Sequence, residues 1–371
     1  MEFNFVIPCL LGIEKLIADE LKALECKNVI AQNGRVLFCG DENILARVNI
    51  CSRYAERVLI LVSDFTAVTF EELFEKTKAA DWESFIGPLD AFPVKGYSLD
   101  SALFSVRDCQ AIIKKAVVER LKSKYKIEWF EESGPIHQIQ FSIMKNTVSL
   151  MIDTSGAGLH KRGYRLKANA APIKETLAAS LCTLSHLMPY HKLYDPMCGS
   201  GTILIEGALI ACNKAPGIKR NFSAERFDII PRDVWARERE RARSLERIPN
   251  DFEAFGSDID EESLETAKQN ASNAGVSKYI NFKKADVKNF AFATERGTLI
   301  TNPPYGERML TLNECQALYR ELGRIFAPER GKSYTIISPD EEFEQAFGRK
   351  ADKRRKLYNG MIKCQAYMYF K

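Results

Sequence analysis

The sequence predicts an α/β protein in which two small α+β modules precede a larger α/β domain. In the first half of the chain, strands, helices and a hairpin signal follow one another in an order typical of α+β modules. After residue 165, strands alternate with helices, a pattern typical of a parallel sheet with helices on both faces. A segment rich in glycine and basic residues, 153–165, separates the two patterns and is expected to be a hinge. The expected domains are residues 1–65, 66–155 and 166–371.

The first module has the element order of a ferredoxin-like unit. Apolar residues after Gly12 recur at helical spacing, and Asn33-Gly34 between two strand-like segments is a strong signal for a tight hairpin. The expected order is β-α-β-β-α-β, which is the split βαβ arrangement. Its strands are expected at residues 3–8, 28–31, 35–39 and 57–63, and its helices at 13–24 and 42–51.

The rest of the chain continues with a second α+β block and then the α/β domain. The second block is expected to have helices at 70–79 and 105–125 and strands at 92–98, 136–144 and 148–152. In the α/β domain, strands are expected at 192–194, 253–257, 280–283, 297–301, 333–338 and 362–370. Its helices are expected at 172–187, 202–212, 261–274 and 312–326, and a polar insertion at 213–251 is expected to be partly helical from Arg232.

The composition of this 371-residue chain is that of a globular protein, with 46% hydrophobic and 27% charged residues. No run reaches the roughly 18 apolar residues of a membrane span. Ten cysteines without a CxxC pair and only four histidines argue against a zinc site and against a disulfide framework. The expectation is a cytoplasmic protein with no membrane partner and no metal.

Basic charge is clustered, although the net charge is only +4. The segment Arg107–Lys126 has seven basic and two acidic residues, Lys219–Arg247 has nine and six, and Arg349–Lys356 has six and one. Such clusters are typical of proteins that bind a polyanion. Solvated helix faces are the alternative reading of any single cluster.

A glycine turn follows the first strand of the α/β domain, in the segment Asp195-Pro-Met-Cys-Gly-Ser-Gly-Thr202. Two closely spaced glycines let the backbone turn sharply and approach a ligand. The following helix start offers free N–H groups to it. No lysine follows the second glycine, which excludes a Walker loop, and the spacing is not GxGxxG.

Two aspartates end the next two strands of this domain. Asp258 is placed to accept both hydroxyls of a ribose, and Asp286 is placed to accept from an adenine amino group. Ligands of open α/β sheets bind at the carboxyl edge, where these residues and the glycine turn would meet. Each aspartate alone could equally be an ordinary turn residue.

An Asn302-Pro-Pro-Tyr305 tetrad follows a fourth strand. The prolines fix the backbone and remove two donors, so the turn presents mainly acceptors. The side-chain carbonyl of Asn302 adds another acceptor, and Tyr305 offers a flat face for stacking. The tetrad therefore suits a planar amine whose NH₂ group is held by acceptors.

Together these motifs resemble those of the class I S-adenosylmethionine-dependent amino-methyltransferases. DPMCGSGT, GSDID, KADV and NPPYGER match that family's motifs in order. With DTSGAGLHKRGYR and Lys174-Glu175, the chain more narrowly resembles the THUMP-domain RNA guanine-N(2)-methyltransferases, including the bacterial enzyme of 23S ribosomal RNA. The resemblance implies a Rossmann-like methyltransferase domain with a seven-stranded mixed sheet, preceded by ferredoxin-like and THUMP modules.

The resemblance also implies a reaction and a set of site residues. The enzyme would transfer a methyl group from S-adenosylmethionine to the 2-amino group of a guanine held by Asn302, Pro303, Pro304 and Tyr305. The residues expected to bind the cofactor are Asp195, Pro196, Cys198, Gly199, Ser200, Gly201, Thr202, Asp258, Ile259, Asp286, Val287 and Asn302.

RNA is the expected partner, namely 23S ribosomal RNA or its ribosomal precursor, with transfer RNA as the alternative. The side chains expected to bind RNA are Lys114, Lys115, Lys122, Lys124, Arg162 and Arg165. A hinge salt bridge is the alternative role of the two arginines. A non-catalytic RNA-binding protein or chaperone with a vestigial cofactor site is the rival from another class, and a DNA adenine methyltransferase would use the same tetrad.

Overall fold

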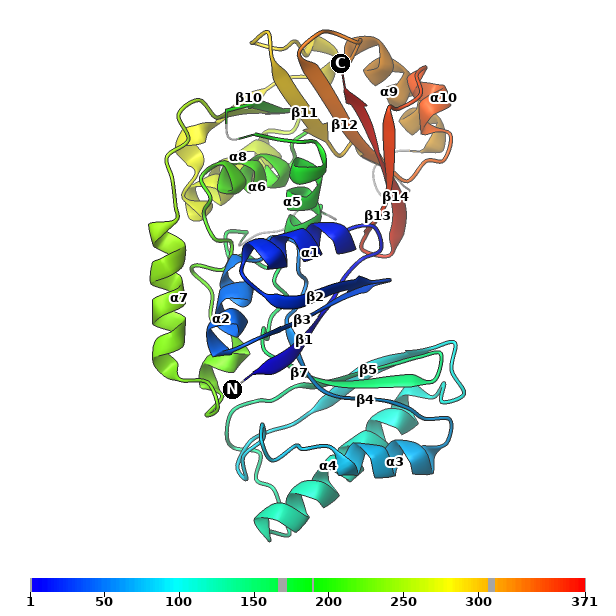
Figure 1. Ribbon diagram of the computed structural model, residues 1–371. Helices are drawn as coiled ribbons and strands as arrows, with labels where there is room; N and C mark the ends of the chain where they lie inside the picture. The colour runs from blue at the N-terminus through cyan, green and yellow to red at the C-terminus, as the bar shows by residue number, and fades with distance from the viewer. Residues whose placement is uncertain (1, 166–171, 189, 306–310, 371) are drawn as a thin grey trace. The chain divides into compact units, whose positions relative to one another are not determined.

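The computed structural model describes residues 2–165, 172–188, 190–305 and 311–370 (Figure 1). The described chain forms two compact units, and their boundary falls within helices α1 (Glu14–Ala23) and α7 (Arg232–Ser244). The first unit contains the residues up to Cys9, Ala18–Leu159 and Asn221–Glu240. The second contains Leu10–Ile17, His160–Arg220 and the chain from Arg241 onward.

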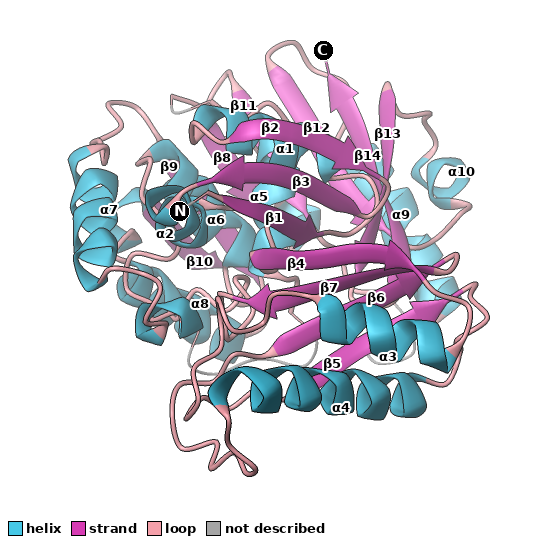
Figure 2. Ribbon diagram, turned by 60° about the horizontal axis from the view of Figure 1, so that its bottom comes forward, coloured by secondary structure: helices cyan, strands magenta, loops and turns pink. Residues whose placement is uncertain are grey.

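The first unit is built on one continuous seven-stranded sheet, although the sequence suggested two separate modules. Its strand order is β2-β3-β1-β4-β7-β6-β5 (Figure 2). Strand β4 pairs antiparallel with β1 on one side and with β7 on the other, and so joins the ferredoxin-like part to the second block. The strands are β1 (Phe3–Pro8), β2 (Lys27–Gln32), β3 (Arg35–Gly40), β4 (Leu59–Thr66), β5 (Val94–Leu99), β6 (Ile139–Met144) and β7 (Thr147–Asp153). The helices are α2 (Glu42–Cys51), α3 (Phe70–Ala79) and α4 (Val106–Tyr125), and α3 and α4 lie side by side in Figure 2.

The start of the expected hinge is a buried polar network of the first unit. Asp153 is 1% exposed and forms an ion pair with Arg57. Asn49 donates to Thr154 Oγ1 at 2.9 Å and accepts from Ser155 Oγ at 2.7 Å. Buried polar groups with satisfied hydrogen bonds fix a unique local structure. Residues 153–155 are therefore fixed within the first unit, and the boundary between the two units in this segment falls between Leu159 and His160.

The second unit contains the seven-stranded mixed sheet that the sequence led us to expect. Its order is β10-β9-β8-β11-β12-β14-β13, with the first five strands parallel and β14 antiparallel to both of its neighbours. The strands are β8 (Lys192–Asp195), β9 (Glu253–Asp258), β10 (Ile280–Lys284), β11 (Gly297–Thr301), β12 (Lys332–Ser338), β13 (Lys353–Asn359) and β14 (Ile362–Phe370). The helices are α5 (Glu175–Leu184), α6 (Thr202–Ala211), α8 (Glu261–Ala274), α9 (Leu312–Ile325) and α10 (Phe343–Phe347).

Strand β13 and the short helix α10 are elements that the sequence analysis missed, and β13 is the larger omission. Its residues Lys353–Lys356 were read only as part of a basic cluster, because four consecutive cations hide the alternation of a strand. The strand lies at the edge of the sheet and pairs only with β14. Edge strands tolerate cations, which also discourage pairing with another chain. No helix within the described ranges is both long enough and apolar enough to span a membrane.

Candidate active site

The glycine turn links the carboxyl end of β8 to helix α6. Gly199 and Gly201 both have positive φ, at +48° and +79°. A Cβ at Gly201 would lie 3.0 Å from the Cβ of Ala267, so Gly201 lets the turn pack closely on α8. A Cβ at Gly199 would meet nothing within 4 Å. The backbone at Gly199 is therefore open to a ligand.

The neighbouring strand β9 holds this turn in place. The N–H of Cys198 donates to the carbonyl oxygen of Ser257 at 3.0 Å, and the N–H of Gly199 donates to Oδ2 of Asp258 at 2.8 Å. The side chain of Asn270 donates to the carbonyl oxygen of Ser200 at 3.1 Å. Asp258 thus lies directly beside the glycine turn, where the sequence analysis placed it for a ribose.

Asp195 is buried at the start of the turn, and its carboxyl group joins β8 to β11. Its Oδ1 accepts from the hydroxyl of Thr301 at 2.8 Å and from the N–H of Met197 at 3.3 Å. Burial raises the pKa of Asp195 to about 7, even though both hydrogen bonds lower it. Burial also raises the pKa of the Cys198 thiol, so this residue stays neutral and is not a thiolate nucleophile.

The tetrad begins immediately after Thr301, at the carboxyl end of β11. Oδ1 of Asn302 is buried and has no hydrogen-bond partner in the described part of the chain. The carbonyl oxygen of Pro303 likewise accepts no hydrogen bond from the described residues. The hydroxyl of Tyr305 accepts from Nδ2 of Asn359 at 2.7 Å, which fixes the half-buried ring. The Gly306-Glu307-Arg308 part of the motif lies outside the described residues.

The hydrogen bonds therefore bring three sequence motifs to one place. The Asp195–Thr301 bond ties the glycine turn to the tetrad, and the Gly199–Asp258 bond ties it to the next strand. All three features lie at the carboxyl ends of adjacent parallel strands, the edge where open α/β sheets bind ligands.

The other residues expected to bind the cofactor lie at the same edge of the sheet, and they differ in how far they are exposed to solvent. Ile259 is 69% exposed beside Asp258. Asp286 follows β10 and accepts from the N–H of Lys288 at 2.9 Å, while Val287 is 7% exposed and packs in the aromatic core cluster. Pro196, Ser200 and Thr202 belong to the turn itself. The roles of these residues toward a cofactor stay predictions.

The two arginines expected at RNA have partners within the second unit. Arg162 has a 2% exposed side chain with Nε 3.6 Å from Oε1 of Glu206. Arg165 donates to Oγ1 of Thr202 at 2.5 Å and lies 3.5 Å from Glu175. These contacts agree with the alternative role of the two arginines, namely salt bridges. The bond to Thr202 also places Arg165 next to the residue that follows the second glycine of the turn.

The four lysines expected at RNA all lie on α4. Lys114 pairs with Glu132 and donates to the carbonyl oxygen of Phe92 at 3.1 Å. The other three have weaker or more exposed contacts: Lys115 lies 5.7 Å from the ring centroid of Phe74, Lys122 lies 3.5 Å from Glu128, and Lys124 lies 2.7 Å from Glu83. An exposed pair such as Lys122–Glu128 contributes little to stability, whereas Lys124 shares the mostly buried Glu83 with Arg120. The binding of RNA by the four lysines stays a prediction.

Three positioning residues escaped the sequence analysis. Thr301 holds Asp195, Asn270 holds the carbonyl of Ser200, and Asn359 holds Tyr305. Thr301 could have been found from its place between a strand and the tetrad. Asn270 lies 70 positions from Ser200, and Asn359 lies 54 positions from Tyr305, so no local sequence pattern points to either residue.

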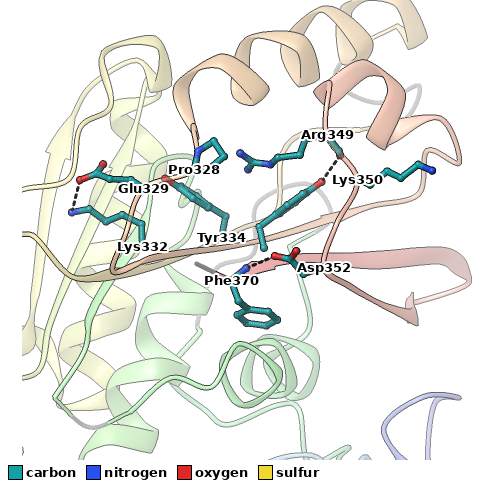
Figure 3. A pocket seen from close by; sticks show the side chains of 9 residues that line it. Pro328, Glu329, Lys332, Tyr334, Arg349, Lys350, Asp352 and Phe370 are labelled. Carbon is teal, nitrogen blue, oxygen red and sulfur yellow. Dashed lines mark hydrogen bonds and ion pairs between the residues drawn. The ribbon is translucent and has the colours of Figure 1, made fainter.

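A pocket elsewhere in the second unit is distinct from this site. Its lining includes Lys332 at the start of β12 and Phe370 at the end of β14, which places it at the amino edge of the parallel strands (Figure 3). Arg349 lies 4.6 Å from the centroid of the Tyr369 ring and donates to the carbonyl oxygen of Phe326 at 3.0 Å. The cation of Arg349 is thus already engaged by the protein.

Comparison with known proteins identifies the family. A model described as the RMKL-like methyltransferase domain matches residues 162–368, one described as the RlmL ferredoxin-like domain matches 4–59, and the THUMP domain model matches 67–153. The chain belongs to the RMKL-like methyltransferase family. The expectation of a THUMP-domain class I methyltransferase with a Rossmann-like domain is confirmed.

Individual relatives agree with this assignment. The methyltransferase is 43% identical over 100% of its length to a Bacillus subtilis protein provisionally named RNA methyltransferase YpsC, and covers 96% of that protein. It is 32% identical, over 99% of its length, to the ribosomal RNA large subunit methyltransferase K/L of Shewanella amazonensis, and spans about half (53%) of that relative. The solved structure of SMU.472, a provisionally named methyltransferase complexed with SAH, matches with a TM-score of 0.92 and 39% identity, covering 100% of this chain and 98% of that one.

S-adenosylmethionine is the cofactor of this methyltransferase, and the site residues fit it. A Cβ at Gly199 would meet nothing within 4 Å, so the backbone there is open, and the amino-acid part of the cofactor would fit against it. The carboxylate of Asp258 stands beside that turn, and the buried carboxyl of Asp195 offers negative charge toward a cation. Among the described residues, no group of side chains suited to a metal ion is found.

The raised pKa of Asp195 predicts a pH-dependent affinity for S-adenosylmethionine. A cationic ligand favours the carboxylate, so below pH 7 binding must also release the proton that Asp195 then holds. The affinity should therefore rise with pH, by up to about tenfold per unit, and level off above about pH 7. Calorimetric titration from pH 5.5 to 8.5 measures this, with Asp195→Asn as the variant whose profile should be flat. A flat profile for the unaltered protein would contradict the prediction.

Proposed function

We propose that this methyltransferase transfers the methyl group of S-adenosylmethionine to the exocyclic 2-amino group of a guanine in 23S ribosomal RNA. The observation that carries the proposal is the buried Oδ1 of Asn302, which, like the neighbouring carbonyl oxygen of Pro303, has no hydrogen-bond partner among the described residues. A buried acceptor without a partner costs free energy, on the order of 1–3 kcal/mol, unless a ligand satisfies it. An NH₂ group has the two donors that this pair of acceptors needs.

The proposed reaction depends on positioning. When bound, the cofactor supplies an electrophilic methyl group on a sulfonium. Asn302 and Pro303 would hold the two N–H groups, so that the nitrogen lone pair faces that methyl group. The rigid proline backbone fixes this geometry before the substrate arrives, and such pre-organisation accounts for much of the rate of a displacement reaction. The amine becomes acidic as it gains the methyl group, so no strong general base is needed.

Tyr305 would stack on the guanine ring after the base leaves its helix. Its hydroxyl is already held by Asn359, so the ring keeps one orientation. Burial raises the pKa of Tyr305, and the phenol therefore stays neutral. A neutral, fixed aromatic face suits stacking, and extrusion of the base is how enzymes reach an atom inside a helix.

RNA as the substrate is supported by the THUMP domain and by the relatives. The K/L relatives are named for large-subunit ribosomal RNA, and the Bacillus subtilis relative is named for RNA. Two other substrates carry an amine that the same tetrad could hold. Adenine in DNA has an exocyclic amine, and transfer RNA contains guanines that are chemically identical to those of ribosomal RNA.

Mass spectrometry of nucleosides tests the proposal. Unmodified 23S ribosomal RNA, transfer RNA and double-stranded DNA would each be incubated with the protein and S-adenosylmethionine and then digested. We expect N(2)-methylguanosine from 23S ribosomal RNA alone. Methyladenine in any substrate, or N(2)-methylguanosine from transfer RNA alone, would refute the substrate assignment. No methylated nucleoside from any of them would favour a non-catalytic RNA-binding role.

A further inference from the structure

The hairpin of β13 and β14 combines features that the site described above does not use. It has a cationic strand, an exposed apolar tip and a direct hydrogen bond to the tetrad. Figure 1 shows these two strands as neighbours at one end of the sheet. All of these features belong to the second unit.

The cationic strand is β13, with Lys353, Arg354, Arg355 and Lys356 in succession. Lys353, Arg354 and Lys356 are exposed, and only Arg354 pairs with an acid within the described part, Glu344 at 3.5 Å. Successive strand residues project to opposite faces, so the cations lie on both sides of the edge strand, whose backbone at Lys356 packs closely against Gly12. A row of exposed lysines without acidic partners is suited to a phosphate backbone.

The apolar tip is the two-residue turn that joins the strands. Asn359 pairs with Ile362 in the ladder, and Gly360 and Met361 form the turn between them. Gly360 has a φ of +65°, which a two-residue hairpin requires at this position. Met361 is 96% exposed and Ile362 is 49% exposed. A lone exposed apolar residue is ordinary, so the position of this one decides its meaning.

That position is close in sequence to residues that contact the tetrad. Asn359 is two residues before Met361 and donates to the hydroxyl of Tyr305 at 2.7 Å. On the other strand, the Sγ of Cys364 lies 3.9 Å from the same hydroxyl. Residues on both sides of the turn thus contact Tyr305, and Met361 lies between them in the hairpin.

We propose that this hairpin holds the RNA strand at the target nucleotide. Lys353 and Lys356 bind flanking phosphates, and Met361 packs into the space that the base leaves when it is extruded. Apolar side chains, methionine among them, insert between stacked bases in other nucleic-acid complexes. The inference rests on the proposed function, because it assumes that the base acceptor is in RNA.

The phosphate arm of the proposal is tested by salt titration of RNA binding. The probe is unmodified 23S ribosomal RNA, and the variant is Lys353→Gln with Lys356→Gln. Each lost phosphate contact should lower the slope of log affinity against log salt by about 1, so the expected loss is about 2. The matched control is Lys278→Gln with Lys283→Gln, which removes two exposed lysines near the opposite edge of the sheet and should keep the slope. An unchanged slope in the β13 variant would overturn the proposal.

The apolar arm is tested by Met361→Ser. Because Met361 is almost fully exposed, this variant should keep its melting temperature and its affinity for S-adenosylmethionine. Its turnover number on 23S ribosomal RNA should fall about tenfold while RNA affinity changes less than threefold, and Met361→Leu should restore turnover. Turnover of Met361→Ser equal to that of the unaltered protein would overturn this role.

Failure of the proposed function can be told apart from failure of this inference. If the unaltered protein makes no N(2)-methylguanosine, the reaction is wrong, but the salt slopes still decide whether β13 binds RNA. If the unaltered protein methylates guanine and neither variant differs from it, the function stands and the inference falls.

Discussion

Replacing Asn302 with alanine is expected to abolish methyl transfer, with turnover falling at least about a thousandfold. The variant removes the buried acceptor that is proposed to hold the amine, and a misplaced nucleophile loses most of the benefit of positioning. Binding of S-adenosylmethionine should change less than about threefold. A radiolabelled methyl assay measures turnover, and calorimetry measures cofactor binding.

A conservative variant separates this role from a structural one. Asn302→Asp keeps an acceptor oxygen at the same place and should retain measurable turnover, whereas a general loss of structure would affect both variants alike. Turnover of Asn302→Ala within tenfold of the unaltered protein would show that another group holds the amine. Loss of cofactor binding in Asn302→Ala would show that the residue acts mainly on the cofactor side.

Replacing Asp258 with alanine is expected to weaken binding of S-adenosylmethionine by roughly a hundredfold. A charge-assisted hydrogen bond contributes on the order of 1.5–3 kcal/mol, and the variant loses the expected contacts to the ribose. It also loses the carboxylate that holds the N–H of Gly199 and so loosens the turn. Calorimetric titration gives the affinity directly.

The matched control for Asp258 is its neighbour Asp260. Asp260 caps α8 by accepting from the N–H groups of Glu262 and Ser263, and it makes no hydrogen bond to the glycine turn. Asp260→Ala should cost about 1 kcal/mol of stability through the lost cap, yet leave the cofactor affinity within threefold. Equal loss of affinity in both variants would mean that the effect is on α8 and not on a ribose contact.

The parts of the site that the sequence predicted share one property: each lies within a few residues of a strand end. Asp195, Gly199, Asp258 and Asn302 follow strands with clear apolar patterns, and parallel strands bring their carboxyl ends to the same edge. Local pattern and one topological rule were therefore enough to bring these residues together. The hydrogen bonds between Asp195 and Thr301 and between Gly199 and Asp258 join the carboxyl ends of these neighbouring strands.

What the sequence could not show depends on strand pairing and hydrogen bonds that no local apolar pattern reveals. The charged strand β13 is held in the sheet by its ladder with β14, not by an apolar pattern of its own. Residues 153–155 were included in the expected hinge because the segment 153–165 is rich in glycine and basic residues. The partners that bury them, Asn49 and Arg57, lie about a hundred positions earlier.

The pairing of β4 with β7 has a consequence for dissecting the protein. A fragment that stopped after the ferredoxin-like part would leave β4 with a bare row of backbone donors and acceptors, the kind of edge that recruits other chains. The THUMP domain cut out alone would suffer the same loss at β7. The ferredoxin-like and THUMP domains in this half thus share one sheet, and we expect either of them, cut out alone, to aggregate through its exposed strand edge.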